Sequence, residues 1–192
     1  MTDQDFPRPV RSFEVDGRAI HVFDGLLPNA GAYEQGLGRA AFTRTEVARP
    51  DTAGYRHWVT ETRLEALRQQ PIYGLTLQAV ECVRPGEGYE AYRAYTNVAT
   101  YGDMLFTHVD CLPERRDLTA LWYICEQWDI EWGGETVFFD ANDEIAASVR
   151  PAPGRLVVFD GAIKHVGRPP SRICYYPRYT FALKLTPASR AG

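Results

Sequence analysis

Two of the four histidines stand in settings that suit a metal ion. His108 and Asp110 lie two positions apart in Phe106-Thr-His-Val-Asp110, so on a strand their side chains would share one face. His165 comes later, after a strand-like apolar run and a turn. Two imidazoles and one carboxylate hold a divalent metal and leave positions open, which is typical of non-haem Fe(II) that activates O₂. We therefore expect His108, Asp110 and His165 to bind one metal ion.

Arg178 opens the last strand-like segment and is a candidate for binding an anion. A buried guanidinium without a partner is very costly, and its planar donors match a carboxylate with two parallel hydrogen bonds. A small dicarboxylate is therefore a suitable ligand, although a surface arginine at a strand end would look the same. Alternation divides this segment into two faces, one with Tyr179, Phe181, Leu183 and Leu185, the other with Arg178, Thr180, Ala182 and Lys184.

The first half of the chain predicts a hairpin followed by helices. The pair Asp16-Gly17 between alternating segments is a strong hairpin signal for Val10–Phe23. Apolar spacing and boundary residues predict helices over Asn29–Ala41, Thr60–Gln70 and Tyr73–Val83. The helices precede the strand-rich part instead of alternating with it, which argues against a doubly wound sheet.

From Tyr92 onward, short β-branched and aromatic runs are separated by glycine, proline and aspartate. This spacing is typical of a β-sandwich or barrel. The predicted fold class is therefore α+β and mainly β, with helices packed on one side of a β-core. The expected strands are Tyr92–Tyr101, Leu105–Val109, Leu118–Glu126, Glu135–Phe139, Ala146–Val149, Leu156–Phe159 and Arg178–Leu185.

Composition and charge narrow the function classes. The 192 residues fit one domain spanning residues 1–192, and the net charge of −4 does not suit a nucleic-acid-binding surface. No apolar run is long enough to span a membrane, and the N-terminus lacks the apolar segment of a secretory signal. The four cysteines are widely spaced and are expected to be free thiols. We therefore expect a cytoplasmic protein that binds neither nucleic acid nor membranes, whose oligomeric state stays open.

From Tyr92 to Thr186 the chain resembles the Fe(II)/2-oxoglutarate-dependent dioxygenases, and within them the prolyl-4-hydroxylase-like group. This resemblance implies a double-stranded β-helix, or jelly roll, over residues 92–186. Residues 1–91 would then form the hairpin and the supporting helices. The motifs that carry the resemblance are His108-Val-Asp110, Trp132-Gly-Gly-Glu-Thr136, Pro153-Gly-Arg-Leu-Val-Val-Phe159, His165 and Arg178-Tyr-Thr-Phe.

The resemblance also implies roles for individual residues. His108, Asp110 and His165 match the iron ligands, and Arg178 matches the residue that binds the distal carboxylate of 2-oxoglutarate. Tyr101 and Tyr123 each match a tyrosine that contacts this cosubstrate. The spacing of 13 residues from His165 to Arg178 is longer than usual in the family, which leaves Arg172 as a rival for the carboxylate.

The implied activity couples oxidative decarboxylation of 2-oxoglutarate to succinate and CO₂ with hydroxylation of an unactivated C–H bond. It requires Fe(II) and O₂, with ascorbate as a candidate reductant. The presence of Asp110 favours hydroxylation over halogenation, because related iron halogenases lack this carboxylate. The substrate would be a small molecule or a peptidyl, prolyl-like group. Two alternatives stay open, a cupin-like metal enzyme that uses no 2-oxoglutarate and a non-enzymatic jelly roll that binds or senses a small molecule.

Overall fold

The structure is a computed structural model that describes residues 7–188. Its first element is the hairpin of β1 (Arg11–Val15) and β2 (Arg18–Phe23), which pair in antiparallel register. Asp16 and Gly17 form the turn with φ angles of 50° and 74°, as a two-residue hairpin turn with matching twist requires. The hairpin predicted from the Asp-Gly pair is confirmed.

Three α-helices follow, α1 (Ala30–Leu37), α2 (Leu64–Leu67) and α3 (Pro71–Val83). Pro71 occupies the first turn of α3, where its missing N–H costs nothing. The helix predicted over residues 60–70 is wrong in its first part, because Thr60 and Glu61 end strand β4 (His57–Glu61). Pairing of β4 with β5 (Tyr89–Ala99) overrides the local helix signal there.

The strands form two antiparallel sheets. The main sheet has eight strands in the order β1-β2-β9-β6-β11-β5-β4-β3. It includes β3 (Thr43–Glu46), β6 (Leu118–Ile124), β9 (Leu156–Asp160) and β11 (Arg178–Pro187). The smaller sheet has the order β10-β7-β8, with β7 (Thr136–Phe139), β8 (Ile145–Val149) and β10 (Lys164–Gly167). The expected jelly-roll core with few helices is confirmed, and the N-terminal strands β1–β4 extend its main sheet.

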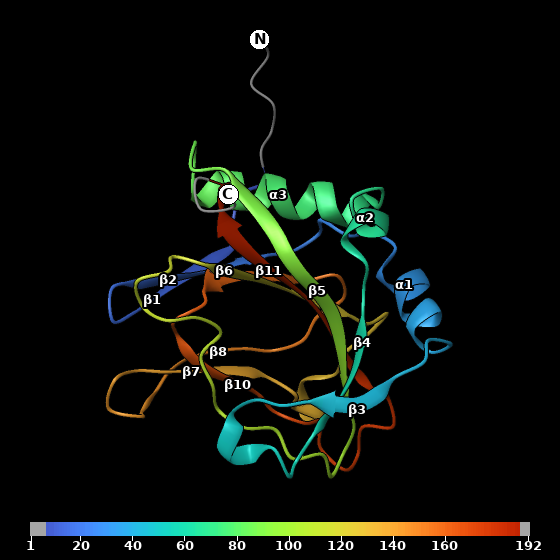
Figure 1. Cartoon of the computed structure of the whole chain (residues 1–192). Coiled ribbons are helices and arrows are strands. Elements are labelled where there is room, and N and C mark those ends of the chain that lie inside the picture. The colour runs from blue at the N-terminus through green and yellow to red at the C-terminus, as the bar shows by residue number, and fades with distance from the viewer. Residues whose placement is uncertain (1–6, 189–192) are drawn as a thin grey trace.

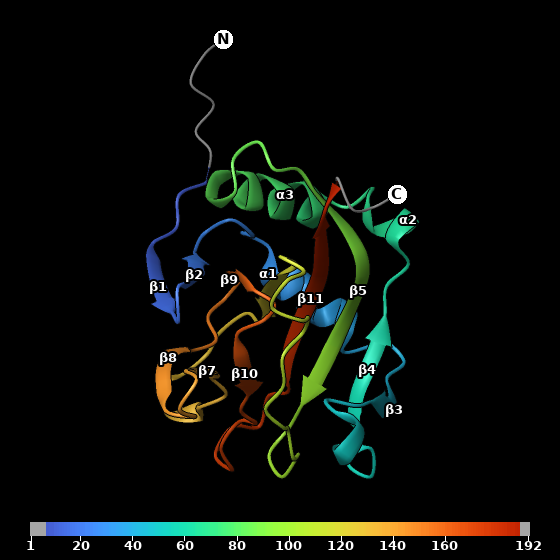
Figure 2. The same ribbon diagram turned by 60° about the vertical axis from the view of Figure 1, so that its left-hand side comes forward.

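The molecule has three layers, with helices on one side of the main sheet and the small sheet on the other (Figures 1 and 2). Trp122 on β6 packs on the helix side, where its indole N–H donates to Thr76 Oγ1 of α3 at 2.9 Å. Tyr123, the next residue, faces the small sheet and packs with Phe138 and Phe159. The alternation predicted for β11 also holds, because Phe181, Leu183 and Leu185 join the core on the helix side.

One expected strand is largely absent. Residues 105–109 form no ladder, and only His108 makes an isolated antiparallel bridge, to His165. The partner strand β10 was not predicted, because the sequence before His165 indicates a turn. β10 has only four residues, and on the edge that faces the 105–109 segment it forms the His108–His165 bridge alone.

No helix in the described part of the chain combines the length and the apolar character needed to cross a membrane. The four cysteines are all free, in agreement with the expectation from their spacing.

Candidate metal centre

Backbone pairing brings His108, Asp110 and His165 together from two distant segments. His108 and His165 exchange both backbone hydrogen bonds of their bridge, at 3.0 and 2.9 Å. Asp110 donates its backbone N–H to the carbonyl of Gly161 at 2.7 Å. A Cβ atom on Gly161 would lie 3.4 Å from Asp110 Cβ and 3.0 Å from Cys111 Sγ, so the absence of a side chain permits this close approach.

The two imidazoles are held in the same tautomer. His108 Nδ1 lies 3.0 Å from the carbonyl oxygen of Phe106, and His165 Nδ1 lies 2.9 Å from that of Ile163. A carbonyl oxygen can only accept a hydrogen bond, so each Nδ1 carries a proton, and in a neutral imidazole Nε2 is then the nitrogen with the lone pair. This is the usual way in which proteins orient histidine ligands of a metal.

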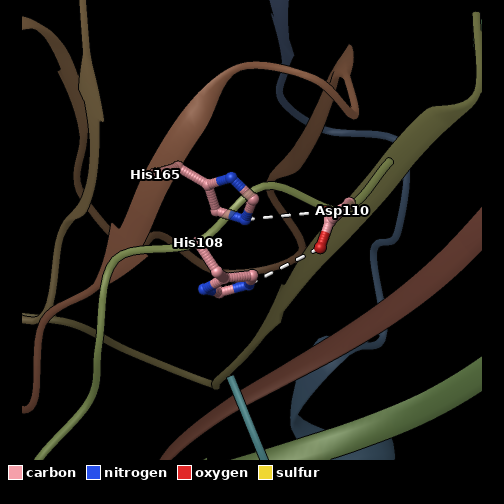
Figure 3. Close-up of side chains that lie close together, drawn as sticks. All are labelled: His108, Asp110 and His165. Carbon is pink, nitrogen blue, oxygen red and sulfur yellow. Dashed lines mark ion pairs between the residues drawn. The ribbon is translucent and has the colours of Figure 1, made fainter. Parts of the chain in front are cut away.

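Both Nε2 atoms face the Asp110 carboxylate (Figure 3). His108 Nε2 lies 3.5 Å from Oδ1, and His165 Nε2 lies 3.6 Å from Oδ2. One ligand atom from each residue falls within 4.8 Å of the others. Metal–ligand bonds of about 2.1 Å place neighbouring ligand atoms about 3 Å apart, so small side-chain adjustments suffice for these three residues to hold one ion. The donor set is that of the two-histidine, one-carboxylate iron sites.

The electrostatics keep Asp110 and His165 in the form that binds a metal. Burial by itself would raise the pKa of Asp110, but the nearby cation of Lys184, with the imidazoles, holds it well below its ordinary value. Burial lowers the pKa of His165 to about 4, against the opposite effect of Asp110. The site therefore holds a carboxylate and a neutral His165 imidazole at neutral pH, as metal binding requires.

Arg178 lies at the start of β11, 4% exposed, on the face that lines the cavity between the two sheets. Its Nε donates to the carbonyl of Gly134 at 2.6 Å, and its Nη2 donates to Thr136 Oγ1 at 3.0 Å. Burial lowers its pKa. Within residues 7–188, no carboxylate forms an ion pair with this guanidinium, so a buried cation lacks its counter-charge.

Two glycines give the guanidinium its space. A Cβ atom on Gly167 would lie 3.1 Å from both Nη atoms of Arg178. A Cβ atom on Gly134 would lie 3.3 Å from Arg178 Cδ and 3.0 Å from the Trp128 ring, and Gly134 also has a φ of +81°. Gly167, which contacts the guanidinium, follows His165 by two positions on β10, so these two residues lie about 7 Å apart along one face of the strand. A five-carbon dicarboxylate suits this separation.

Tyr123 and Tyr101 differ sharply in their surroundings. The Tyr123 side chain is fully buried, its hydroxyl donates to Thr136 Oγ1 at 2.6 Å, and Arg178 lies 5.3 Å from its ring centroid. The Tyr101 side chain is 63% exposed and is not among the residues that line the central cavity. A contact of Tyr101 with the cosubstrate stays a prediction.

Arg172 lies exposed on the loop that connects β10 to β11. This loop is held against residues 131–133, where Ser171 donates its backbone N–H to the Trp132 carbonyl at 2.7 Å. Tyr176 stacks on the Trp132 ring with centroids 5.1 Å apart. The unusual spacing after His165 is therefore taken up by an outer loop, while Arg178 stays in the sheet.

Sequence reasoning did not single out three polar residues of the cavity wall, His57, Asn97 and Lys184. The alternation along the last strand predicted that Lys184 shares a face with Arg178, but it gave no function for Lys184. His57 is buried in the structure. Among the described residues, His57 Nε2 and Asn97 Oδ1 are buried without a hydrogen-bond partner.

A jelly roll that presents two imidazoles and one carboxylate is typical of one class of protein, the non-haem iron oxygenases. Residues 96–183 match the family model described as the 2OG-Fe(II) oxygenase superfamily, and this stretch includes the three clustered residues and Arg178. The segment that carries the site is thus similar to this superfamily, whose members depend on iron and 2-oxoglutarate. This result argues against the cupin-like and non-enzymatic alternatives.

Solved structures of low sequence identity share the fold. A prolyl hydroxylase from Trichoplax adhaerens, in complex with a peptide of hypoxia inducible factor, is 15% identical with a TM-score of 0.65, over 88% of this chain and 84% of that chain. A viral collagen prolyl hydroxylase from Paramecium Bursaria Chlorella virus-1 is 14% identical with a TM-score of 0.63, over 96% and 98%. HygX from Streptomyces hygroscopicus, with nickel and 2-oxoglutarate bound, is 14% identical with a TM-score of 0.61, over 88% and 83%. No protein with a curated description matches the chain in sequence.

Proposed function

We propose that this protein hydroxylates an unactivated C–H bond of a small-molecule or peptidyl, prolyl-like substrate, with Fe(II) bound by His108, Asp110 and His165. The observation that carries the proposal is the pair of Nε2 lone pairs directed at one carboxylate. When bound, iron and 2-oxoglutarate supply the oxidising chemistry, with release of succinate and CO₂.

In this proposal, Arg178 binds the distal carboxylate of 2-oxoglutarate and so gains the counter-charge it lacks. Tyr123 and Thr136 keep the guanidinium in place, Tyr123 through its ring and Thr136 by accepting from Nη2. The edge-to-face contact of Phe159 with His165, with centroids 4.8 Å apart, excludes water from one side of the imidazole. Tyr101 is a further candidate contact for the cosubstrate.

The direct test is to add Fe(II) and 2-oxoglutarate to the protein without oxygen and to record its visible spectrum. A weak charge-transfer band is expected, because the cosubstrate would chelate the metal. Succinate release is then measured in air against pools of prolyl peptides and of small molecules, with mass spectrometry for a gain of one oxygen. Absence of the band, together with absence of succinate for every pool, would contradict the proposal.

The substrate would enter through a polar cleft that adjoins the central cavity. Its outer wall includes Glu46 and Arg93, which form an ion pair at 2.8 Å. His57 and Asn97 line both the cleft and the central cavity. Their unpartnered polar atoms are costly when buried, so a substrate that carries an O–H or N–H group beside the oxidised carbon would be favoured.

Replacement of His57 by phenylalanine tests this part of the proposal. The substitution keeps a ring against Phe106, now 6.4 Å from the His57 ring centroid and nearly parallel to it, but removes Nε2. Substrate-stimulated succinate release should fall about 10-fold, the value of one buried hydrogen bond, while the Fe(II)/2-oxoglutarate band persists. His21→Phe is the matched control, since His21 lies on β2 and bonds Ser12. Equal loss in both variants would remove His57 from the substrate site.

Two further features belong to the proposal. Ascorbate is a candidate reductant that restores the metal to Fe(II) after uncoupled turnover. A cytoplasmic location is in keeping with the four free cysteines, since disulfides are rare in that compartment.

A further inference from the structure

Lys184 lies deep in the site and touches the carboxylate that we assign to the metal. It follows Arg178 by six positions on β11, faces the same cavity and is 7% exposed. Its Nζ contacts Asp110 Oδ2 and also lies 3.1 Å from Thr119 Oγ1. Thr119 Oγ1 in turn donates to the same oxygen, Asp110 Oδ2, at 2.5 Å. Two donors from neighbouring strands of the main sheet therefore converge on one carboxylate oxygen.

The two oxygens of Asp110 consequently differ. Oδ2 accepts from Lys184 and Thr119, and both bonds bind it to the main sheet. Oδ1 faces the Nε2 atom of His108, 3.5 Å away, and the Nε2 atom of His165 lies 3.6 Å from Oδ2. Because Oδ2 already accepts from two donors of the main sheet, Oδ1 is the oxygen that has the greater freedom to bind a metal together with the imidazoles.

We propose that Lys184, together with Thr119, is a positioning residue that makes Asp110 a single-oxygen ligand and thereby keeps a coordination position open. The inference rests on the proposed function. Three single-atom ligands on an octahedral metal leave room for a chelating α-keto carboxylate and for O₂. If Asp110 were free to bind through both oxygens, it would take one of those positions and compete with the chelator.

A buried ion pair can also serve the fold alone, so the test must separate the two roles. Metal affinity and chelation respond differently. Without Lys184, the Asp110 carboxylate still binds the metal. Its second oxygen then competes with a chelator for a coordination position, so the affinity for the chelator falls. Loss of fold would instead weaken both. Oxalate is a suitable probe because it chelates a metal like an α-keto acid but has no distal carboxylate for Arg178.

The experiment uses Co(II) and oxalate with the full-length protein, read from the visible absorption of Co(II) without turnover. Lys184→Met should bind Co(II) at least as tightly as the wild type, and the Kd of oxalate for the Co(II)-loaded protein should rise about 10-fold or more. Arg178→Ala should bind oxalate as the wild type does. Thr119→Val, a nearly isosteric change, should raise the oxalate Kd in the same direction by a smaller factor, and it serves if Lys184→Met does not fold.

Arg155→Met is the matched control for the loss of a buried cation, because Arg155 pairs with Asp24 at the ends of β9 and β2, away from Asp110. It should leave both Co(II) and oxalate binding unchanged. An unchanged oxalate Kd in folded Lys184→Met, or loss of Co(II) binding in that variant, would overturn the role given to Lys184 and leave the proposed function intact. Failure of the wild type to bind Co(II) would overturn both.

Discussion

At the scale of single residues, Arg178 is a buried cation without an anionic partner among the described residues. Its guanidinium donates hydrogen bonds to the Gly134 carbonyl and the Thr136 hydroxyl, which are both neutral. Within residues 7–188, no carboxylate balances its positive charge. Such a group is expensive to bury, and for this reason we propose that the carboxylate of a bound ligand supplies its counter-charge. Arg172, the rival residue, is exposed on a loop and needs no partner.

Arg178→Ala should therefore raise the KM for 2-oxoglutarate by about 10- to 100-fold, because charge-assisted hydrogen bonds contribute about 1.5–3 kcal/mol. Arg172→Ala should leave this KM unchanged. The measurement is succinate release as a function of 2-oxoglutarate concentration for both variants. The reverse ranking would move the carboxylate site to the loop.

Gly167→Ala tests the same pocket from the opposite side. The new methyl group would lie 3.1 Å from both Nη atoms of Arg178, so the guanidinium must shift. We expect weaker 2-oxoglutarate binding with unchanged metal affinity, measured by titration of the Fe(II) band without oxygen. Gly36→Ala in α1 is the control, since its added Cβ meets no atom within 4 Å. If both variants bind 2-oxoglutarate equally well, Arg178 has more freedom than its contacts indicate.

At the scale of elements, the two faces of the main sheet have separate tasks. The face toward α3 carries the larger apolar cluster, and the face toward the small sheet carries a second apolar cluster and the site. Neighbouring residues on one strand therefore face different parts of the molecule: Trp122 packs against the helices, and Tyr123 lies beside Arg178. Trp122 joins β6 to α3 through Thr76, whose own hydroxyl donates to the Ile72 carbonyl at 2.7 Å.

Thr76→Val should separate stability from function. The change leaves the buried Trp122 N–H without an acceptor, which costs about 1–3 kcal/mol of unfolding free energy. Urea denaturation should show this loss, while the affinities for metal and 2-oxoglutarate stay the same because the opposite face is untouched. Weaker 2-oxoglutarate binding without a loss of stability would show that the two faces are coupled.

At the scale of the whole molecule, the site lies between the two sheets and uses groups from both. The small sheet provides His165, whereas the main sheet provides Arg178 and the donors that hold Asp110. A metal ion and a cosubstrate bound there would connect the layers. Ligands that bind the folded state alone stabilise it by mass action.

Mn(II) and 2-oxoglutarate together should therefore raise the Tm by about 10 to 20 °C at concentrations about 100 times their Kd. Thermal unfolding followed by fluorescence or circular dichroism measures the shift. Asp110→Ala should lose it, because the metal and the chelated cosubstrate would leave together. A full shift in this variant would indicate that the stabilising ligands bind elsewhere.

Short-range patterns in the sequence were enough to predict much of this protein. The Asp-Gly turn, the alternation along β11 and the apolar spacing of α3 each depend on a few neighbouring residues, and the structure has all three. The side-chain types at positions 108, 110 and 165 also suffice to indicate the chemistry, because imidazole and carboxylate ligands have specific metal preferences.

Tertiary structure alone decided the remaining features. Strand β4 replaced part of a predicted helix because β5 lies beside it, and pairing across the chain outweighs local preference. The same long-range packing buried His57, left Tyr101 exposed and brought Lys184 to the Asp110 carboxylate. Contacts of this kind join residues far apart in the chain, and no periodicity of a single segment contains them.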